Sequence, residues 1–207
     1  GGEIILALPF TWVFIKDVPP LLKLSWQVGS AGIVELPMRA TKRFRVVEEL
    51  VRGRHIAGYA ALAEEPDLDE ALTELARRGA LIYLPRIDNY RLGRMSFARG
   101  DGELRPNRYG IAEPGRAAST RRAAALDIAL LPLVGFDARG ARLGMGGGYY
   151  DRAFAFRRHL RAVPRPRLIG IAFACQQTDA LPLAAHDVQL DAIVTENGLT
   201  RFGRSTR

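Results

Sequence analysis

Apolar residues beyond position 40 recur in two patterns, one with the period of a helix and one typical of buried strands. The clearest helix begins near Asp67, which can cap its first turn, and Glu70 follows three residues later as in a capping box. Gly79 is placed to end this helix. An earlier helix is predicted from Phe44, Val47 and Val51 and ends at Gly53, and the apolar stripe of the clearer helix consists of Leu68, Ala71, Leu72, Leu75 and Ala76.

Short apolar runs between these helices predict the strands of a sheet. The run at residues 128–134 is apolar throughout, as expected for a central strand covered on both faces. Pro85 is expected to stop the strand that precedes it. A further helix is expected at residues 149–160, and the remaining strands at residues 55–61, 80–84, 95–98, 168–173 and 192–195. Strands that alternate with helices favour an α/β fold with a largely parallel sheet and helices on both sides.

Composition is consistent with one globular domain. The chain has 207 residues, of which 48% are hydrophobic and 25% charged, close to the average of soluble domains. The first 40 residues follow no clean period and are left unassigned, and residues 41–207 are expected to form a single α/β domain. The apolar stretch from Ile4 to Ile15 is too short for the roughly 20 residues that span a bilayer. It also lacks a basic leader, so we expect a cytoplasmic protein.

The number of cysteines and the net charge limit which classes of function the chain can have. Cys175 is the single cysteine, which excludes an internal disulfide and a multi-cysteine zinc site, and we interpret it as structural. Thirty basic against 22 acidic side chains give a net charge of +8. This charge suits an anionic partner such as a nucleotide, a polyglutamate tail or RNA. Compositional bias toward arginine is an equal alternative, since Lys16, Lys23 and Lys42 are the only lysines.

A glycine-rich segment carries the most chemistry. Glycines 144, 146, 147 and 148 lie between a predicted strand and a predicted helix, where bare main-chain amides can form a concave anion site. Arg142 at the entrance can donate to phosphate oxygens, and Asp151 at the start of the helix can hold Mg²⁺. A P-loop is excluded because no Gly-Lys-Ser/Thr follows. The dinucleotide motif G-x-G-x-x-G also fails, because Tyr149 occupies its third glycine position.

The whole string from Arg142 to Asp151, which follows an apolar strand and Phe136-Asp137, resembles the signature of the 5-formyltetrahydrofolate cyclo-ligases. The similarity covers residues 55–200 and is stronger in the second half. Downstream it rests on Ile169–Phe173, Gln176, Leu181-Pro182, His186-Asp187, Asp191 and Thr195–Gly198. Upstream it rests on Glu65, Asp67, Leu84–Arg86, Met95, Phe97, Gly110-Ile111 and Glu113-Pro114.

This resemblance implies a three-layer α/β/α fold, broadly like that of sugar-phosphate isomerases and CoA transferases. It also implies ATP and Mg²⁺ as cofactors and 5-formyltetrahydrofolate, with or without a polyglutamate tail, as substrate. The formyl oxygen would attack the γ-phosphate of ATP, and N10 would then attack the activated carbon and expel phosphate. The products would be 5,10-methenyltetrahydrofolate, ADP and phosphate. We expect a monomer that binds neither nucleic acid nor membrane.

The family's site residues map onto matching positions of this chain. Arg142 and Asp151 would be catalytic, and Asp151 and Asp187 would bind the metal ion. Glu65 would hydrogen-bond the pterin ring, with Met95, Phe97 and Tyr150 as apolar walls. ATP would contact Arg142, Leu143, Gly144, Met145, Gly146, Gly147, Gly148, Tyr149 and Tyr150, and the folate would contact Glu65, Met95, Phe97, Met145, Gly146, Gly147, Gly148 and Tyr149.

Several of these residues have structural alternatives. Asp187 and Asp191 could cap turns around a strand, and His186 beside Asp187 could be an ordinary surface pair. Tyr149 and Tyr150 are adjacent on a helix and therefore point in different directions, one to the site and one inward.

The N-terminal segment departs from the family. Its members begin with a helix whose basic residues contact ATP, and Lys23, Lys42 with Arg45, or Arg39 with Arg43 are weak substitutes. This departure leaves open a non-catalytic folate or nucleotide binder. The arginine excess leaves open an RNA-binding module, although no RNP-like aromatic pattern supports one.

Overall fold

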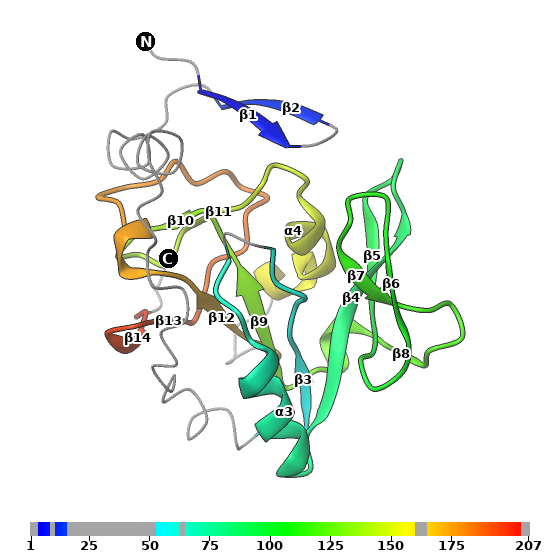
Figure 1. Cartoon of the computed structure of the whole chain (residues 1–207). Coiled ribbons are helices and arrows are strands. Elements are labelled where there is room, and N and C mark those ends of the chain that lie inside the picture. The colour runs from blue at the N-terminus through cyan, green and yellow to red at the C-terminus, as the bar shows by residue number, and fades with distance from the viewer. Residues whose placement is uncertain (1–3, 9–10, 16–52, 63–64, 160–164, 204–207) are drawn as a thin grey trace, which may run out of the picture.

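A computed structural model describes residues 4–8, 11–15, 53–62, 65–159 and 165–203. The helix predicted from Phe44, Val47 and Val51, together with Lys23, Lys42, Arg45, Arg39 and Arg43, lies outside the described residues. The main feature is one eight-stranded sheet (Figure 1). Its strands are β3 (His55–Ala57), β4 (Leu81–Asn89), β5 (Arg94–Arg99), β8 (Thr120–Arg121), β9 (Ile128–Pro132), β12 (Arg167–Ile171), β13 (Ala192–Thr195) and β14 (Gly198–Arg201).

The strand order is β14-β13-β12-β9-β3-β4-β5-β8. The five central strands, from β13 to β4, pair in parallel, whereas β14, β5 and β8 pair antiparallel with their neighbours. The predicted largely parallel sheet is therefore confirmed, with antiparallel strands added at both edges.

Helices and smaller hairpins surround this sheet. The helices are α3 (Asp69–Arg77) and α4 (Tyr149–Ala153), and the 3-10 helices are η1 (Ala123–Ala125), η2 (Ala155–His159) and η3 (Ala174–Gln176). The hairpins are β1 (Ile4–Leu8) with β2 (Thr11–Ile15), β6 (Leu104–Pro106) with β7 (Ala112–Pro114), and β10 (Gly135–Phe136) with β11 (Arg142–Leu143). No helix of the described segments is long and apolar enough to cross a membrane.

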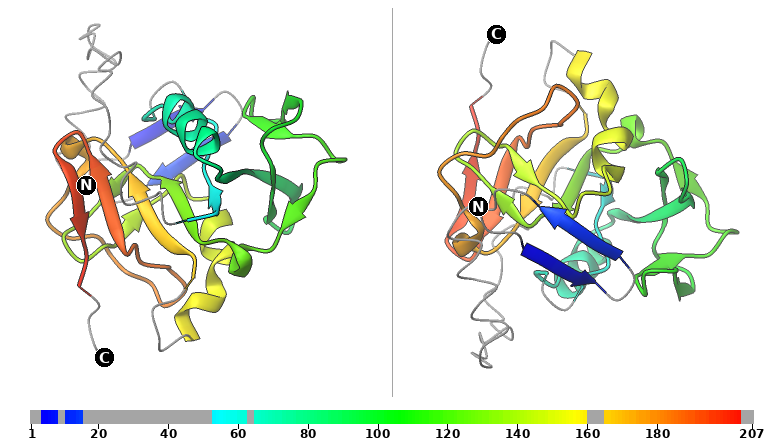
Figure 2. Two further views of the ribbon diagram at one scale, coloured as in Figure 1. Left: turned by 90° about the horizontal axis from the view of Figure 1, so that it is seen from below. Right: turned by 90° about the horizontal axis from the view of Figure 1, so that it is seen from above.

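Alternating side chains of the central strands build two cores. On β9, Ile128 and Leu130 enter the core beneath α3, while Ala129 and Leu131 enter the core on the opposite face. α3 covers one face, and α4 with η2 covers the other (Figure 2). Each apolar side chain of β9 is thereby buried against a helix layer, which explains its continuous apolar sequence.

The prediction that Pro85 stops its strand is wrong, because β4 continues to Asn89. β4 pairs with β3 only up to Tyr83 and beyond it pairs with β5 alone. Ile82 accepts a hydrogen bond from Gly100 N at 3.1 Å, so alternation turns the nitrogen of Pro85 away from β5. The missing N–H therefore costs no ladder bond.

The capping box predicted at the start of α3 is absent. Leu68 is the N-cap residue and has no side-chain cap, while Asp67 accepts a hydrogen bond from Asp69 N at 2.8 Å. The Asp67 carboxylate thus closes a local turn, while the N-cap position lies one residue after the predicted one. Leu68, Leu72 and Leu75 are buried as expected, but Ala76 is exposed because it lies at the solvent edge of the stripe.

The helix predicted at residues 149–160 is two short pieces. α4 ends at Ala153, and η2 follows with Phe154 at the junction. Phe154 is fully buried and Arg157 is 7% exposed. The 3-10 geometry brings residues three apart to the same side, so both side chains point inward.

Gly170 in β12 tests how tightly this strand packs against the neighbouring apolar side chains. A Cβ at Gly170 would lie 2.6 Å from Ile193 Cδ1, 2.7 Å from Leu190 Cδ1 and 2.8 Å from Leu133 Cδ2. Gly170→Ala should therefore lower the free energy of unfolding by about 1–3 kcal/mol through overpacking. Gly102→Ala, where a Cβ meets nothing within 4 Å, is the matched control. Urea titrations that leave Gly170→Ala as stable as this control would contradict the packing.

Candidate active site

The carboxyl end of the parallel strands is where the predicted site residues gather. From β3 the chain crosses by α3 to β4 on one side, whereas from β9 it crosses to β12 on the other side. The adjacent strands β3 and β9 therefore form the topological switch point, beside which open α/β sheets bind ligands. Glu65 follows β3, and the glycine-rich segment follows β9. The fold thus brings together two segments that are distant in the sequence.

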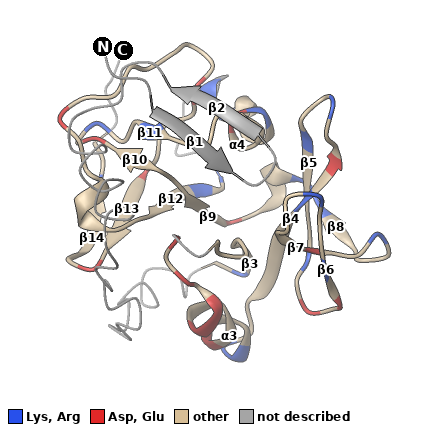
Figure 3. Ribbon diagram, turned by 45° about the horizontal axis from the view of Figure 1, so that its top comes forward, with Lys and Arg blue, Asp and Glu red and all other residues tan. Residues whose placement is uncertain are grey.

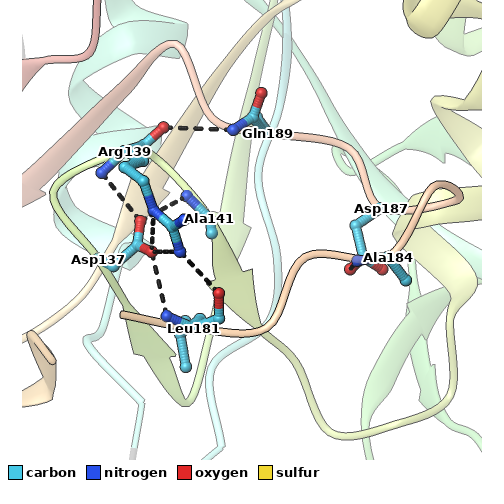
Figure 4. A network of polar contacts seen from close by, with 7 residues as sticks. All are labelled: Asp137, Arg139, Ala141, Leu181, Ala184, Asp187 and Gln189. Carbon is cyan, nitrogen blue, oxygen red and sulfur yellow. Dashed lines mark hydrogen bonds and ion pairs between the residues drawn. The ribbon is translucent and has the colours of Figure 1, made fainter. Parts of the chain in front are cut away.

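A buried carboxylate fixes the turn that leads into the glycine-rich segment. Asp137 is fully buried between β10 and β11 (Figure 4). It accepts hydrogen bonds from Arg139 N at 2.9 Å, Ala141 N at 3.0 Å and Leu181 N at 3.1 Å. The Arg139 guanidinium donates to the same carboxylate at 2.7 Å and to Leu181 O at 2.7 Å. This network holds the β10–β11 turn against the segment that leads to Asp187.

The same network keeps Asp137 ionised. Burial alone would raise its pKa, but the hydrogen bonds from Arg139, Leu181 N and Ala141 N outweigh burial and lower the pKa. The carboxylate therefore stabilises the turn as an anion.

The backbone N–H groups of the glycine-rich loop lack hydrogen-bond acceptors among the described residues. The five N–H groups from Gly144 to Gly148 donate no hydrogen bond to any other described residue. Gly146 and Gly148 have φ of 81° and 61°, which only glycine adopts without strain. Met145 is 43% exposed at the tip. Consecutive unpaired amides of this kind are what an anion-binding loop requires.

Arg142 on β11 and Asp151 on α4 face each other beside this loop. Arg142 Nη2 donates to Asp151 Oδ1 at 2.7 Å, and the two side chains are 5% and 20% exposed. Val188 N donates to the same oxygen at 3.2 Å. Arg142 Nε is buried and has no hydrogen-bond partner in the described residues. Arg142 belongs to β11 and Arg152 to α4, so basic residues, which Figure 3 draws in blue on the ribbon, flank the loop in the sequence.

The two tyrosines of the loop occupy different surroundings, as the sequence predicts. Tyr150 packs on the core, where its ring stacks on Phe154 at 6.5 Å. Burial raises the pKa of Tyr150, the Glu65 charge raises it further, and Arg142 partly opposes them. Glu65 lies near enough for its charge to act on Tyr150, and it accepts a hydrogen bond from Leu62 N at 2.9 Å.

The other residues predicted to line the pterin pocket are buried to different extents. Met95 is half-buried and packs against the same core as Tyr150. Phe97 is 1% exposed, with its ring 5.5 Å from that of Phe154. Phe97 lies in the interior of the core in this structure, so its predicted contact with a ligand remains a prediction.

Tyr149 points away from the core toward two hairpins. Its ring lies 5.5 Å from the guanidinium of Arg152, and burial together with the neighbouring Tyr109 raises the pKa of Tyr149. Arg108 lies over the rings of Tyr90 at 4.1 Å and Tyr109 at 4.7 Å. This aromatic and arginine cluster joins the β4–β5 and β6–β7 hairpins to the glycine-rich loop, and no motif in the sequence indicated it.

The remaining acidic candidates have structural partners. Asp187 Oδ2 accepts Ala184 N at 2.8 Å, which closes a turn, and His186 lies 3.6 Å from its other oxygen. Asp191 binds Arg157 at 2.6 Å and Leu168 N at 2.7 Å, which ties η2 to β12. No group of three or more metal-ligating side chains occurs within the described residues.

Comparison with known proteins shows the family of the chain. Residues 35–196 match the model of the 5-formyltetrahydrofolate cyclo-ligase family. The chain belongs to that family. The family resemblance of the string from Arg142 to Asp151 is thus confirmed, while the roles of the individual residues remain predictions.

Cyclo-ligases from several organisms are similar to this chain. The 5-formyltetrahydrofolate cyclo-ligase of Escherichia coli K12 is 32% identical over 164 residues, covering 78% of this chain and 88% of that protein. The Haemophilus influenzae protein of the same name is 32% identical over 142 residues, covering 67% and 74%. The structure of Aquifex aeolicus 5,10-methenyltetrahydrofolate synthetase has a TM-score of 0.68 at 27% identity, covering 90% of this chain and 94% of that one.

The buried Asp137 leads to a prediction on stability and pH. Asp137→Asn should lower the free energy of unfolding at neutral pH by about 2–4 kcal/mol, because several hydrogen bonds to a buried charge are lost. The folded-state pKa of Asp137 is lowered, so its contribution is present above the pKa of an unfolded aspartate and is lost as pH falls through the folded value.

The difference between wild type and Asp137→Asn should therefore shrink below about pH 4 in urea unfolding experiments. Asp101→Asn removes a carboxylate that is 63% exposed and also pairs with an arginine, and it should change stability by less than about 1 kcal/mol. Equal effects of the two variants at neutral pH would contradict the anchoring role.

Proposed function

We propose that this chain catalyses the ATP-dependent cyclisation of 5-formyltetrahydrofolate to 5,10-methenyltetrahydrofolate, with release of ADP and phosphate. Membership of the cyclo-ligase family supports the reaction class. The observation that carries the assignment to a site is the row of unpaired amides from Gly144 to Gly148, which lies beside the buried Arg142. Unpaired donors next to a fixed cation suit a polyphosphate.

The loop and Arg142 would hold the phosphates of ATP. Gly144 lies against the guanidinium, since a Cβ there would be 3.4 Å from Arg142 Nη1. Asp151 orients the guanidinium through Nη2. Phosphoryl transfer depends mainly on positioning and on neutralising charge, and this arrangement supplies both.

Asp151 would also bind the Mg²⁺ that accompanies ATP. Its Oδ1 accepts from Arg142 and Val188, while no described residue donates to Oδ2. Magnesium sites commonly use one or two carboxylates completed by phosphate oxygens and water, so the residues fit an ion that arrives with the nucleotide. Asp187 immediately precedes Val188 and is the second candidate. The ion would neutralise charge on the phosphates.

The folate would lie between the loop and the β3 side of the switch point. Glu65 can accept hydrogen bonds from the amino and N–H groups of a pterin ring. Its charge acts on Tyr150, which together with Met95 would provide the apolar wall of the pocket. Met145 and Tyr149 would border the substrate from the loop.

The chemistry then needs no protein nucleophile. The formyl oxygen attacks the γ-phosphate, ADP leaves, and the phosphorylated formyl carbon becomes electrophilic. N10 attacks this carbon, loses its proton and closes the ring as phosphate departs. Holding the formyl oxygen in line with the γ-phosphate is the task of the loop, because a positioned pair reacts far faster than a free one.

The remaining expectations complete the proposal. We place the activity in the single domain of residues 41–207 and expect it to act as a cytoplasmic monomer. The polyglutamate tail, where present, would extend from the site toward solvent.

Asp151 gives the direct test of the activity. Asp151→Asn should reduce the formation of methenyl product from folinate and MgATP by about 100-fold or more, because both the orientation of Arg142 and the metal ligand are lost. The rise in absorbance of the methenyl product measures the rate. Asp101→Asn is the matched control, since it removes a carboxylate that also pairs with an arginine but lies at the exposed end of β5.

Full activity of Asp151→Asn would refute the role of this residue. Tight binding of folinate in a calorimeter with no release of phosphate by the wild-type chain would instead select a non-catalytic folate binder. Absence of binding of both ATP and folinate would reject the site altogether.

A further inference from the structure

Arg152 connects the glycine-rich loop to a hairpin on the other side of the site. Its Nε donates to Gly93 O at 3.0 Å, and its Nη2 donates to Gly147 O. Its guanidinium also lies 5.5 Å from the centre of the Tyr149 ring. One side chain therefore bridges the β4–β5 turn and the centre of the loop.

Two glycines make room for this bridge. A Cβ at Gly93 would lie 2.0 Å from Arg152 Nη2, and a Cβ at Gly148 would lie 2.8 Å from Arg152 Nη1. Both glycines have positive φ, 57° at Gly93 and 61° at Gly148. The guanidinium thus packs directly against the backbone of both turns, where any larger residue would displace it.

The bond to Gly147 has a consequence for the neighbouring amide. In a trans peptide, the C=O of one residue and the N–H of the next point in opposite directions. Because Arg152 holds the Gly147 carbonyl on its own side, it turns the Gly148 N–H to the opposite side of the loop. That N–H is one of the amides that donate to no described residue.

We propose that Arg152 is a positioning residue that holds the loop from Gly144 to Gly148 in its phosphate-binding shape by bridging Gly147 and Gly93. This inference rests on the proposed function, since it assigns a cause to the open arrangement of the amides. Arg152 acts through the backbone of the loop rather than through contact with the substrate. The bridge also fixes the distance between the loop and the β4–β5 turn.

Variants of Arg152 distinguish its hydrogen-bonded bridge from simple attraction between its positive charge and the ATP phosphates. Arg152→Ala should weaken ATP binding on the order of tenfold, because the hydrogen bonds that shape the loop are lost. Arg152→Lys retains the charge, but a point-like ammonium cannot reproduce the planar fork. We expect the lysine variant to lose most of the same affinity. Arg77→Ala on α3, whose side chain is 76% exposed, is the control for loss of a surface arginine.

A glycine variant tests the bridge without changing any charge. Gly93→Ala should displace the guanidinium and weaken ATP binding by a similar factor. Gly79→Ala is the matched control, because Gly79 also has positive φ, 91°, but a Cβ there meets nothing within 4 Å. Combining Gly93→Ala with Arg152→Ala should be no worse than Arg152→Ala alone, since both changes remove one interaction.

ATP affinity measured by calorimetry, alongside thermal unfolding and steady-state kinetics, decides the outcome. The proposal is supported if Arg152→Lys and Gly93→Ala raise the Kd and KM for ATP while their controls do not. It is overturned if Arg152→Lys binds ATP as wild type does. The positive charge of Arg152 would then explain its contribution to ATP binding without the bridge. It is also overturned if Gly79→Ala loses ATP affinity in the same proportion to its loss of thermal stability as Gly93→Ala does. General destabilisation would then explain the weaker binding.

The two proposals fail in different ways. A wild-type chain that binds ATP without turnover would reject the proposed reaction, and the ATP affinities of the variants would still judge the bridge. Wild-type turnover with unchanged variant affinities would reject the bridge alone. A wild-type chain that binds neither ATP nor inorganic tripolyphosphate would reject both.

Discussion

The buried carboxylate of Asp137 is the interaction on which the candidate site depends. It lies at the carboxyl end of β9 and satisfies backbone N–H groups from two segments, one within the β10–β11 turn and one near Leu181. A buried charge is tolerated only when donors surround it, so the turn and the distant segment must adopt one arrangement. That arrangement sets where Arg142 enters the loop and where Val188 meets Asp151.

The loop supported by this anchor has the opposite character. Its amides from Gly144 to Gly148 are unpaired within the described structure, and Met145 is exposed at its tip. Solvent can satisfy these donors until a ligand replaces it. The turn held by Asp137 supports this open loop. The hydrogen bonds around Asp137 and the bridge of Arg152 hold the backbone, so ligand binding requires little rearrangement of the loop. The ion pair between Arg142 and Asp151 connects the turn around Asp137 to the glycine-rich loop.

Several features of this arrangement could be predicted from particular residues. The apolar run of β9 indicated a central strand, and the string from Arg142 to Asp151 indicated both the turn and the family. The strand around Met95 was also correct. Pro85 misled because its cost depends on whether a neighbouring strand needs its N–H. Asp137 stood just before the recognised string, but nothing marked it as the anchor.

The sequence by itself determined the period of each element, the family and the chemical types available at the site, because these follow from local pattern and from residue identity. Only the tertiary structure decided which of these groups meet. Arg152 and Gly93, and Asp137 and Leu181, are far apart along the chain, and their contacts arise from the way the strand order brings distant segments together. Such contacts depend on the packing of the whole sheet, which no local pattern encodes.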